Sequence, residues 1–164
     1  MKKLVMGILI LSSFVFVPLL SANDLYTLKF DRNTIGFIRK VKVYKAPEWV
    51  AKINLSSGKE LYFCSPKSMF EFYDRPAKWP YLNVKSESDF KAIVVTDFAT
   101  LKPIDAKKAF FVYGSNVISP AGDDLPAFAS YEDAQKFAKK HHAARVFKFD
   151  KVAPGLIRLL NGDI

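Results

Sequence analysis

The sequence predicts an α+β protein made of two small ββαβ units that pack together. The order strand, strand, helix, strand occurs twice along the chain, and the strand-to-helix corner of one half can be laid over that of the other. Tyr62-Phe63-Cys64-Ser65 matches Ala127-Phe128-Ala129-Ser130, and Phe72 then matches Phe137. Since each unit is too small to bury a core alone, we expect the two units to pack against each other.

The first unit is expected over residues 23–100 and begins with an N-terminal extension. Residues 49–55 form its first predicted strand, and residues 61–64 form the second. Between them, Ser56-Ser57-Gly58-Lys59 is typical of a turn in which glycine supplies the tight bend. These segments predict a β-hairpin.

A helix is predicted directly after this hairpin. Ser65 is a favoured N-cap residue, and Pro66 suits the first helical position because its missing N–H is not needed there. Apolar side chains then recur on one face at helical spacing: Met69, Phe72 and Tyr73. Asp74-Arg75-Pro76 ends the helix, and residues 90–97 form the last predicted strand of the unit.

The second unit is expected over residues 101–164 and repeats this order. Its predicted strands are residues 109–114, 125–129 and 145–149. Ser130, followed by Asp133, gives a capping-box-like start to the helix between the last two strands. A short C-terminal helix closes the unit and includes Leu156, Ile157, Leu159 and Leu160.

Residues 1–22 are typical of an export signal. Lys2 and Lys3 form a positive start, and residues 4–20 carry no charge. The small residues of Leu20-Ser21-Ala22 follow, as at a cleavage site. We therefore expect cleavage and a periplasmic protein. The alternative is an uncleaved anchor, and only then is a membrane location expected.

The stretch Leu19-Leu20-Ser21-Ala22 resembles a bacterial lipobox, which requires a cysteine as its next residue. Asn23 stands there instead, so this position has no thiol to lipidate. The protein is therefore not expected to be a lipoprotein.

The chain is strongly basic. It carries 25 Lys and Arg against 16 Asp and Glu, a formal net charge of +9, of which Lys2 and Lys3 contribute two. This balance favours an acidic protein partner or an anionic lipid surface, whereas an exported protein rarely meets nucleic acid. Five basic residues near the second helix form either a positive face for an acidic partner or only a solvated surface: Lys136, Lys139, Lys140, Arg145 and Lys148.

The sequence offers little for catalysis. It has no phosphate-binding loop, no His-Glu-x-x-His motif and no context for a Ser-His-Asp triad. One cysteine and two histidines leave few groups for nucleophilic or general acid–base chemistry. His141 and His142 are adjacent, so on a helix they point to different faces and form no preset metal site. We therefore expect a protein that is not an enzyme, with an enzyme as the third hypothesis.

Three blocks of the sequence resemble the NosL family in their order and spacing. The first block is Tyr44 to Ile53, the second joins residues 95–98 to residues 104–115, and the third is Pro126 to Ala134. Together they fall within residues 36–150. The resemblance implies a pair of ββαβ domains, which agrees with the order of the elements. It also implies an exported accessory factor that binds Cu(I) and serves nitrous oxide reductase.

The chain departs from the family where the resemblance places the copper ligands. The family carries Cys-Gly-Met before the first block, and Arg39-Lys40-Val41 occupies that position here. The family also carries a Gly-Pro-Met-Gly-like turn, and Ser119-Pro120-Ala121-Gly122 occupies its position. Ala121 thus stands in the place of a methionine. The two cationic side chains of Arg39 and Lys40 would repel a metal cation.

Cys64 and Met69 are the candidate metal residues. Cu(I) prefers thiolate and thioether ligands, and these two residues are the one sulfur pair close together in the sequence after the signal. Both could face one pocket, because Cys64 ends a strand and Met69 lies in the first turns of a helix whose N-terminus favours a thiolate. The alternatives are that both pack as core residues, or that Cys64 forms an intermolecular cross-link.

Two functional hypotheses follow from these residues. The first is copper handling, with Cu(I) as the metal, for assembly of a periplasmic copper enzyme such as nitrous oxide reductase. The second is a metal-free interaction or assembly module that kept the fold and lost the copper site. The missing Cys-Gly-Met motif favours the second hypothesis, whereas Cys64 and Met69 favour the first.

Overall fold

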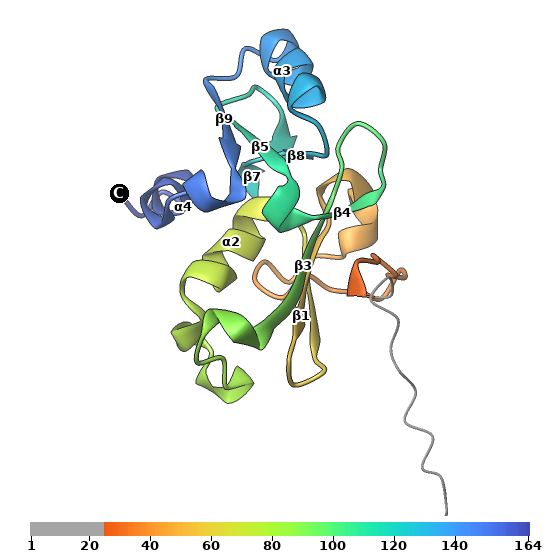
Figure 1. The fold of residues 1–164 in the computed structure, drawn as a ribbon, viewed down its shortest axis with the longest axis vertical. Helices are drawn as coiled ribbons and strands as arrows, with labels where there is room; N and C mark the ends of the chain where they lie inside the picture. Colours follow the sequence, from red (N-terminus) through yellow and green to blue (C-terminus); the bar gives the residue numbers. More distant parts are fainter. Residues whose placement is uncertain (1–24) are drawn as a thin grey trace, which may run out of the picture.

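The computed structural model describes residues 25–164 (Figure 1). The predicted export signal over residues 1–22 and the lipobox position Asn23 lie outside the described residues. Within residues 25–164, antiparallel sheets and α-helices form the mixed α+β fold that the sequence predicts. No helix of this part of the chain is long and apolar enough to cross a membrane.

The first sheet has four antiparallel strands in the order β2-β1-β3-β4. They are β1 (Ala51–Leu55), β2 (Glu60–Phe63), β3 (Phe90–Thr96) and β4 (Pro103–Asp105). The predicted hairpin is β1–β2, but β1 starts two residues later than expected because Pro47–Trp49 forms a 3₁₀ turn. β4 lies beyond residue 100 and completes this sheet. It was not predicted, since three residues that begin with proline show no strand pattern.

The second sheet has the strand order β8-β5-β9. Its strands are β5 (Phe110–Tyr113), β8 (Ala127–Phe128) and β9 (Arg145–Lys148). β8 is shorter than predicted because Pro126 has no N–H to donate to the ladder, although its carbonyl accepts from Val112 N at 3.0 Å. A two-stranded hairpin, β6 (Ile118–Ser119) and β7 (Gly122–Asp123), was not predicted and lies between β5 and β8 in the chain.

The two units follow the same path. In each unit the first strand pairs with the strand just before the helix on one side and with the strand after the helix on the other, which gives β2-β1-β3 and β8-β5-β9. The helices are α2 (Pro66–Asp74) and α3 (Tyr131–Lys140). Ser65 Oγ accepts from Ser68 N at 3.2 Å, and Ser130 Oγ accepts from Asp133 N at 3.0 Å. Both predicted N-caps are therefore confirmed.

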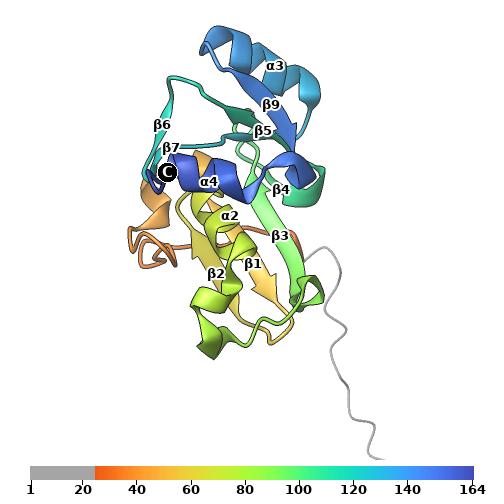
Figure 2. The ribbon, with the colours of Figure 1, turned by 90° about the vertical axis from the view of Figure 1, so that its left-hand side faces the viewer.

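One main apolar cluster joins the two units. It contains side chains from the first sheet, from α2, from the second sheet and from α4 (Pro154–Leu160), among them Ile53, Phe72, Phe111 and Ile157. α2 and α4 pack side by side, as Figures 1 and 2 both show. The two units therefore share a core, which supplies the burial that a single small unit lacks.

The segment before β1 covers the other face of the first sheet. Asn54 Nδ2 donates to the Leu25 carbonyl at 2.7 Å, and the Tyr62 hydroxyl donates to the Lys29 carbonyl at 2.7 Å. A second, smaller apolar cluster forms on this face. Because neighbouring side chains of a strand point to opposite faces, Phe63 faces the main cluster whereas Cys64 faces the second.

Candidate functional site

Cys64 follows β2 directly and is buried, with 2% of its surface exposed. It packs in the second cluster with Val43, Val50 and Ala121, and its Sγ lies 4.0 Å from Ser68 Oγ. Burial raises the pKa of the Cys64 thiol, and this effect outweighs the hydrogen bond from Ser68, which lowers it. The thiol is therefore protonated at neutral pH and must lose its proton to bind a soft metal.

The structure places Cys64 and Met69 in different apolar clusters. Met69 is fully buried in the main cluster, whereas Cys64 belongs to the cluster on the opposite face of the first sheet. Within residues 25–164, no group of three or more His, Cys, Asp or Glu side chains could hold a metal ion. The assignment of Cys64 and Met69 as metal ligands stays a prediction.

The two loops at the family's ligand positions both lie against Cys64. In the first loop, a Cβ added to Gly36 would lie 3.2 Å from the Cys64 backbone nitrogen and 3.5 Å from the Val41 carbonyl oxygen. Gly36 N closes this loop by donating to the Val41 carbonyl at 2.8 Å. In the second loop, the tip of the β6–β7 hairpin, Ala121 packs in the same cluster as Cys64. Both loops therefore lie beside Cys64, the first against its backbone and the second against its side-chain cluster.

The first loop has a backbone shape that suits a glycine. Lys40, which stands where the family carries the glycine of Cys-Gly-Met, has φ 55°, in the left-handed region that glycine adopts most readily. Its Nζ lies 4.9 Å from the Phe37 ring centroid. This conformation supports the alignment of residues 39–41 with the family motif.

Two basic side chains occupy the surroundings of these loops. Arg39 Nη2 contacts Glu71 Oε2 at 2.9 Å and Asn161 Oδ1 at 2.7 Å. Lys67 is only 2% exposed, and its Nζ donates to the carbonyls of Ala121 at 2.6 Å and Leu160 at 3.0 Å. Burial lowers the pKa of Lys67, while the nearby Asp124 raises it. Both side chains are cationic hydrogen-bond donors, and both are engaged by neighbouring groups of the protein.

Asp124 fixes the hairpin to the start of α2. Its Oδ1 accepts from the backbone nitrogens of Lys67 and Leu125, both at 2.8 Å, and its Oδ2 accepts from Ser119 Oγ at 2.7 Å. Ser119 Oγ in turn accepts from Ala121 N at 2.9 Å. Burial raises the pKa of Asp124 and outweighs these hydrogen bonds, which lower it. The network holds Ala121 over the N-terminus of α2, beside Cys64.

Comparison with known protein families shows to which family the chain belongs. The model of the NosL family matches residues 27–157. The chain belongs to the NosL family. Its structure is similar to the crystal structure of the copper chaperone NosL from Shewanella denitrificans, with a TM-score of 0.69 and 18% identity over 80% of this chain and 98% of that chain. A search of curated proteins gave no match.

The NosL fold is thus confirmed, and sequence reasoning missed two residues of the site. Neither Lys67 nor Asp124 was singled out from the sequence. The sequence held one signal for Asp124. Asp123-Asp124 directly precedes an apolar segment, and the buried backbone N–H groups of such a segment need hydrogen-bond acceptors. No local pattern marks Lys67, because its burial depends on the hairpin and on α4.

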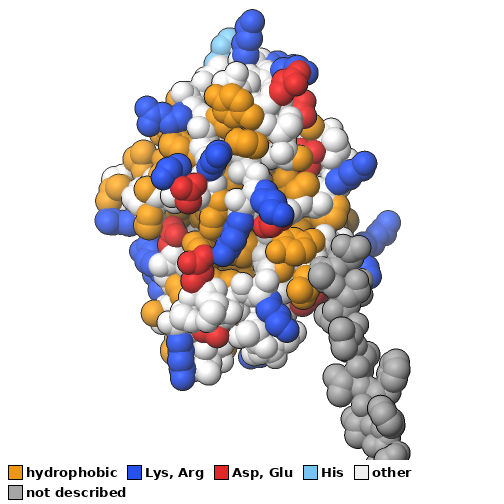
Figure 3. All heavy atoms as spheres, viewed as in Figure 1, with side chains coloured by type: hydrophobic (Ala, Val, Ile, Leu, Met, Phe, Trp, Pro, Cys, Tyr) orange, Lys and Arg blue, Asp and Glu red, His pale blue; other side chains and the backbone are white. Residues whose placement is uncertain are grey.

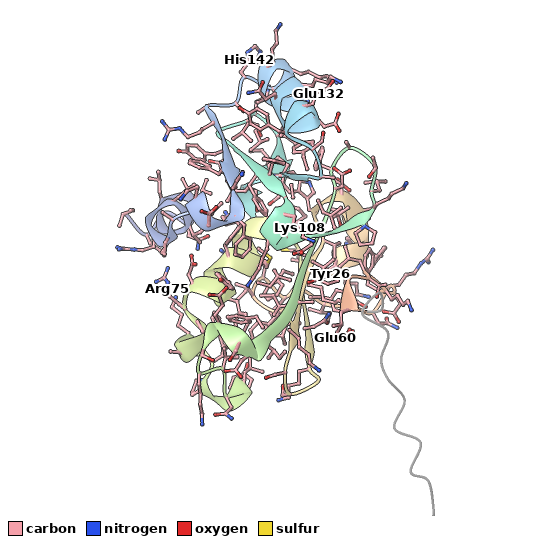
Figure 4. All side chains as sticks on the ribbon, in the orientation of Figure 1. Tyr26, Glu60, Arg75, Lys108, Glu132 and His142 are labelled. Atoms are coloured by element: carbon pink, nitrogen blue, oxygen red, sulfur yellow. The ribbon has the colours of Figure 1, made fainter. Side chains whose placement is uncertain are left out.

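The histidines lie elsewhere in this NosL-family chain. Figure 4 shows His142 at the tip of the second unit, beyond α3. His141 Nδ1 lies 3.1 Å from Asn116 Oδ1, and its ring packs 4.3 Å from the Phe137 centroid. Both of its contacts are thus within the second unit.

Proposed function

We propose that this protein is an exported accessory protein that handles copper for the assembly of a periplasmic copper enzyme such as nitrous oxide reductase. The main support is the convergence of the two ligand-motif loops on Cys64. Membership of the NosL family and the likeness to a copper chaperone support Cu(I) as the cargo. Cu(I) is a soft ion that binds thiolates.

In this proposal Cys64 is the first sulfur ligand and Met69 is the second. Met69 is fully buried in the main cluster, so its side chain has to leave that cluster to reach an ion bound by Cys64. The N-terminus of α2 begins just after Cys64 and favours the thiolate form. Because the thiol is buried, one of the two covering loops has to move before Cu(I) reaches it. Arg39 opposes the arrival of a cation, so we expect modest affinity.

A metal-free assembly module is the second candidate function. One observation favours it: Arg39 and Lys67 are already engaged by neighbouring groups of the protein around the former ligand loops. These contacts make the region a stable polar joint that needs no metal. In that case the protein would act through a protein partner alone.

An anaerobic Cu(I) titration in competition with a chromogenic chelator separates the two candidates. A protein starting at Asn23 keeps every described residue of the three apolar clusters. We expect competition with the chelator that is lost in both Cys64→Ser and Cys64→Ala and weakened in Met69→Leu. Thermal unfolding of each variant shows that the loss does not come from unfolding.

Absence of competition by the folded wild-type protein would contradict copper handling and favour the metal-free module. Unchanged competition in Met69→Leu would remove Met69 as a ligand and leave Cys64 in place. Unchanged competition in both Cys64 variants would place the copper elsewhere and contradict the proposed site.

A further inference from the structure

The second sheet has an open edge where the first sheet has an additional strand. β3 pairs with β1 on one side and with β4 on the other. β9 occupies the corresponding place in the second unit, but it pairs only with β5. Among the described residues, no strand lies on the outer side of β9. The internal repeat therefore leaves the position of a fourth strand unfilled.

The backbone of β9 offers hydrogen-bonding groups on this open side. Val112 N donates to the Pro126 carbonyl, so the backbone of Val112 is directed toward β8. The register partner of Val112 on β9 is Val146. Since hydrogen-bonded and non-bonded pairs alternate in an antiparallel ladder, the N–H and C=O of Val146 point away from β5. Such an edge is a template for pairing with another chain.

A groove of about 650 Å³ lies between α3 and β9. Tyr131 and Gln135 from α3 and Ala143 and Val146 from the other side contribute to its walls. Three basic residues also line it, Lys136, Lys139 and Arg145, together with one acidic residue, Glu132. The Arg145 guanidinium lies 5.7 Å from the Phe147 ring centroid, on the edge strand. The groove thus combines apolar surface, a strand edge and positive charge.

Part of this charge is available to a partner. Lys136 is paired with Glu132 at 2.7 Å, and Figure 4 shows Glu132 on α3 at the outside of the molecule. Lys139 and Arg145, both exposed, form no ion pair with any other described residue. An approaching carboxylate can therefore gain charge-assisted hydrogen bonds without breaking an existing pair.

The positive charge of the chain indicates which kind of molecule would bind in this groove. A second copy of this chain, with a formal net charge of +9, would bring the same cations to the same edge, and like charges would oppose pairing. On the face seen in Figure 3, Lys and Arg are spread among acidic and apolar side chains and form no single broad patch. A strand edge beside a few cations fits an extended acidic peptide better than it fits a broad polyanion.

We propose that the groove between α3 and β9 binds an extended acidic segment of a protein partner, which pairs with β9 as the fourth strand of the second sheet. Backbone hydrogen bonds to Val146 hold the segment, and its carboxylates contact Lys139 and Arg145. Its apolar side chains on the α3 side of the sheet pack toward Ala143 and Val146, and its carboxylates lie on both faces of the strand. This binding is independent of copper and serves either candidate function.

The test uses the capped synthetic octapeptide Glu-Glu-Val-Val-Glu-Glu-Val-Val, which places Glu and Val on both faces of a strand. It is titrated into the ¹⁵N-labelled protein starting at Asn23 and followed by NMR. We expect shifts confined to α3 and residues 143–148, with the Val146 amide gaining protection from hydrogen exchange. Lys139→Glu/Arg145→Glu weakens binding by about tenfold or more, since two charge-assisted contacts are lost. The control Lys59→Glu/Lys91→Glu changes the net charge equally on the first unit and leaves binding unchanged.

A second peptide, N-methylated at every residue, keeps every carboxylate but has no backbone N–H to donate to β9. Equal binding of this peptide would overturn the proposal, as would shifts that centre on another face or an unchanged affinity in Lys139→Glu/Arg145→Glu. The methylated peptide needs only the wild-type protein, so this comparison decides the question even where a variant folds poorly.

Discussion

The Asp124 carboxylate accepts a hydrogen bond from the backbone N–H of Lys67 at 2.8 Å, across 57 positions of sequence. Lys67 is in the first turn of α2, where backbone N–H groups have no partner within the helix. Ser65 satisfies the N–H of Ser68, and Asp124 satisfies that of Lys67. The β6–β7 hairpin is thereby joined to the start of α2, beside Cys64.

Asp124→Ala is expected to lower the free energy of unfolding by about 2–4 kcal/mol, because it leaves three buried donors without an acceptor. These donors are the N–H groups of Lys67 and Leu125 and the hydroxyl of Ser119. Asp124→Asn keeps one acceptor oxygen, so its cost should be about 1 kcal/mol. Urea unfolding measures both variants. Equal costs would contradict the role of the two backbone hydrogen bonds.

Gly36→Ala is expected to destabilise the protein by about 1–2 kcal/mol, since the new Cβ would crowd backbone atoms that cannot easily move. It would lie 3.2 Å from the Cys64 nitrogen. Gly155→Ala, within α4, is the matched control, because no atom lies within 4 Å of its added Cβ. That variant should stabilise by about 0.5–1 kcal/mol. Thermal unfolding of both variants checks the prediction, and a shift of the same sign in both would contradict it.

Asp74→Asn is expected to stabilise the protein at neutral pH. Burial raises the pKa of Asp74 to about 6, against a partial lowering by Arg75, and its Oδ2 has no hydrogen-bond partner among the described residues. The folded state therefore binds the proton more tightly than the unfolded state. Stability falls as pH rises from about 4 to about 6, and the loss is complete above that range.

The full shift corresponds to about 3 kcal/mol, which solvent screening of this half-buried group reduces to about 1 kcal/mol. Urea unfolding between pH 4 and pH 8 should show this decrease in the wild-type protein and not in Asp74→Asn. Asp150→Asn is the control, because Asp150 is exposed and its neighbour Lys151 lowers its pKa. The prediction would be contradicted if the stability of the wild-type protein and that of Asp74→Asn changed with pH in the same way.

Restoring the family motifs is expected to strengthen Cu(I) binding. The variant Arg39→Cys/Lys40→Gly/Val41→Met/Ala121→Met places soft ligands on both loops that contact Cys64 and removes two cations. Competition with the chromogenic chelator should become stronger by about tenfold or more. Lys40→Gly alone is the control, since it relaxes the backbone and adds no ligand. A folded fourfold variant with no gain would contradict the convergence of the two loops.

Local signals were sufficient to predict the elements that follow from neighbouring residues. Ser65-Pro66 and Ser130 start the two helices as predicted, because a cap acts on backbone groups only two or three positions away. β4 and the β6–β7 hairpin escaped prediction. Strands of two or three residues show no alternating pattern, and their existence depends on the strand they pair with.

The sequence by itself determined the α+β class, the repeated order of strands and helices, the resemblance to the NosL family and the absence of the expected ligands at Arg39 and Ala121. Only the tertiary structure decided that Cys64 and Met69 lie in separate clusters, that both motif loops meet at Cys64 and that β9 has an open edge. The reason is physical. Propensity, capping and periodicity act between residues a few positions apart, whereas burial and strand pairing depend on which distant segments come into contact.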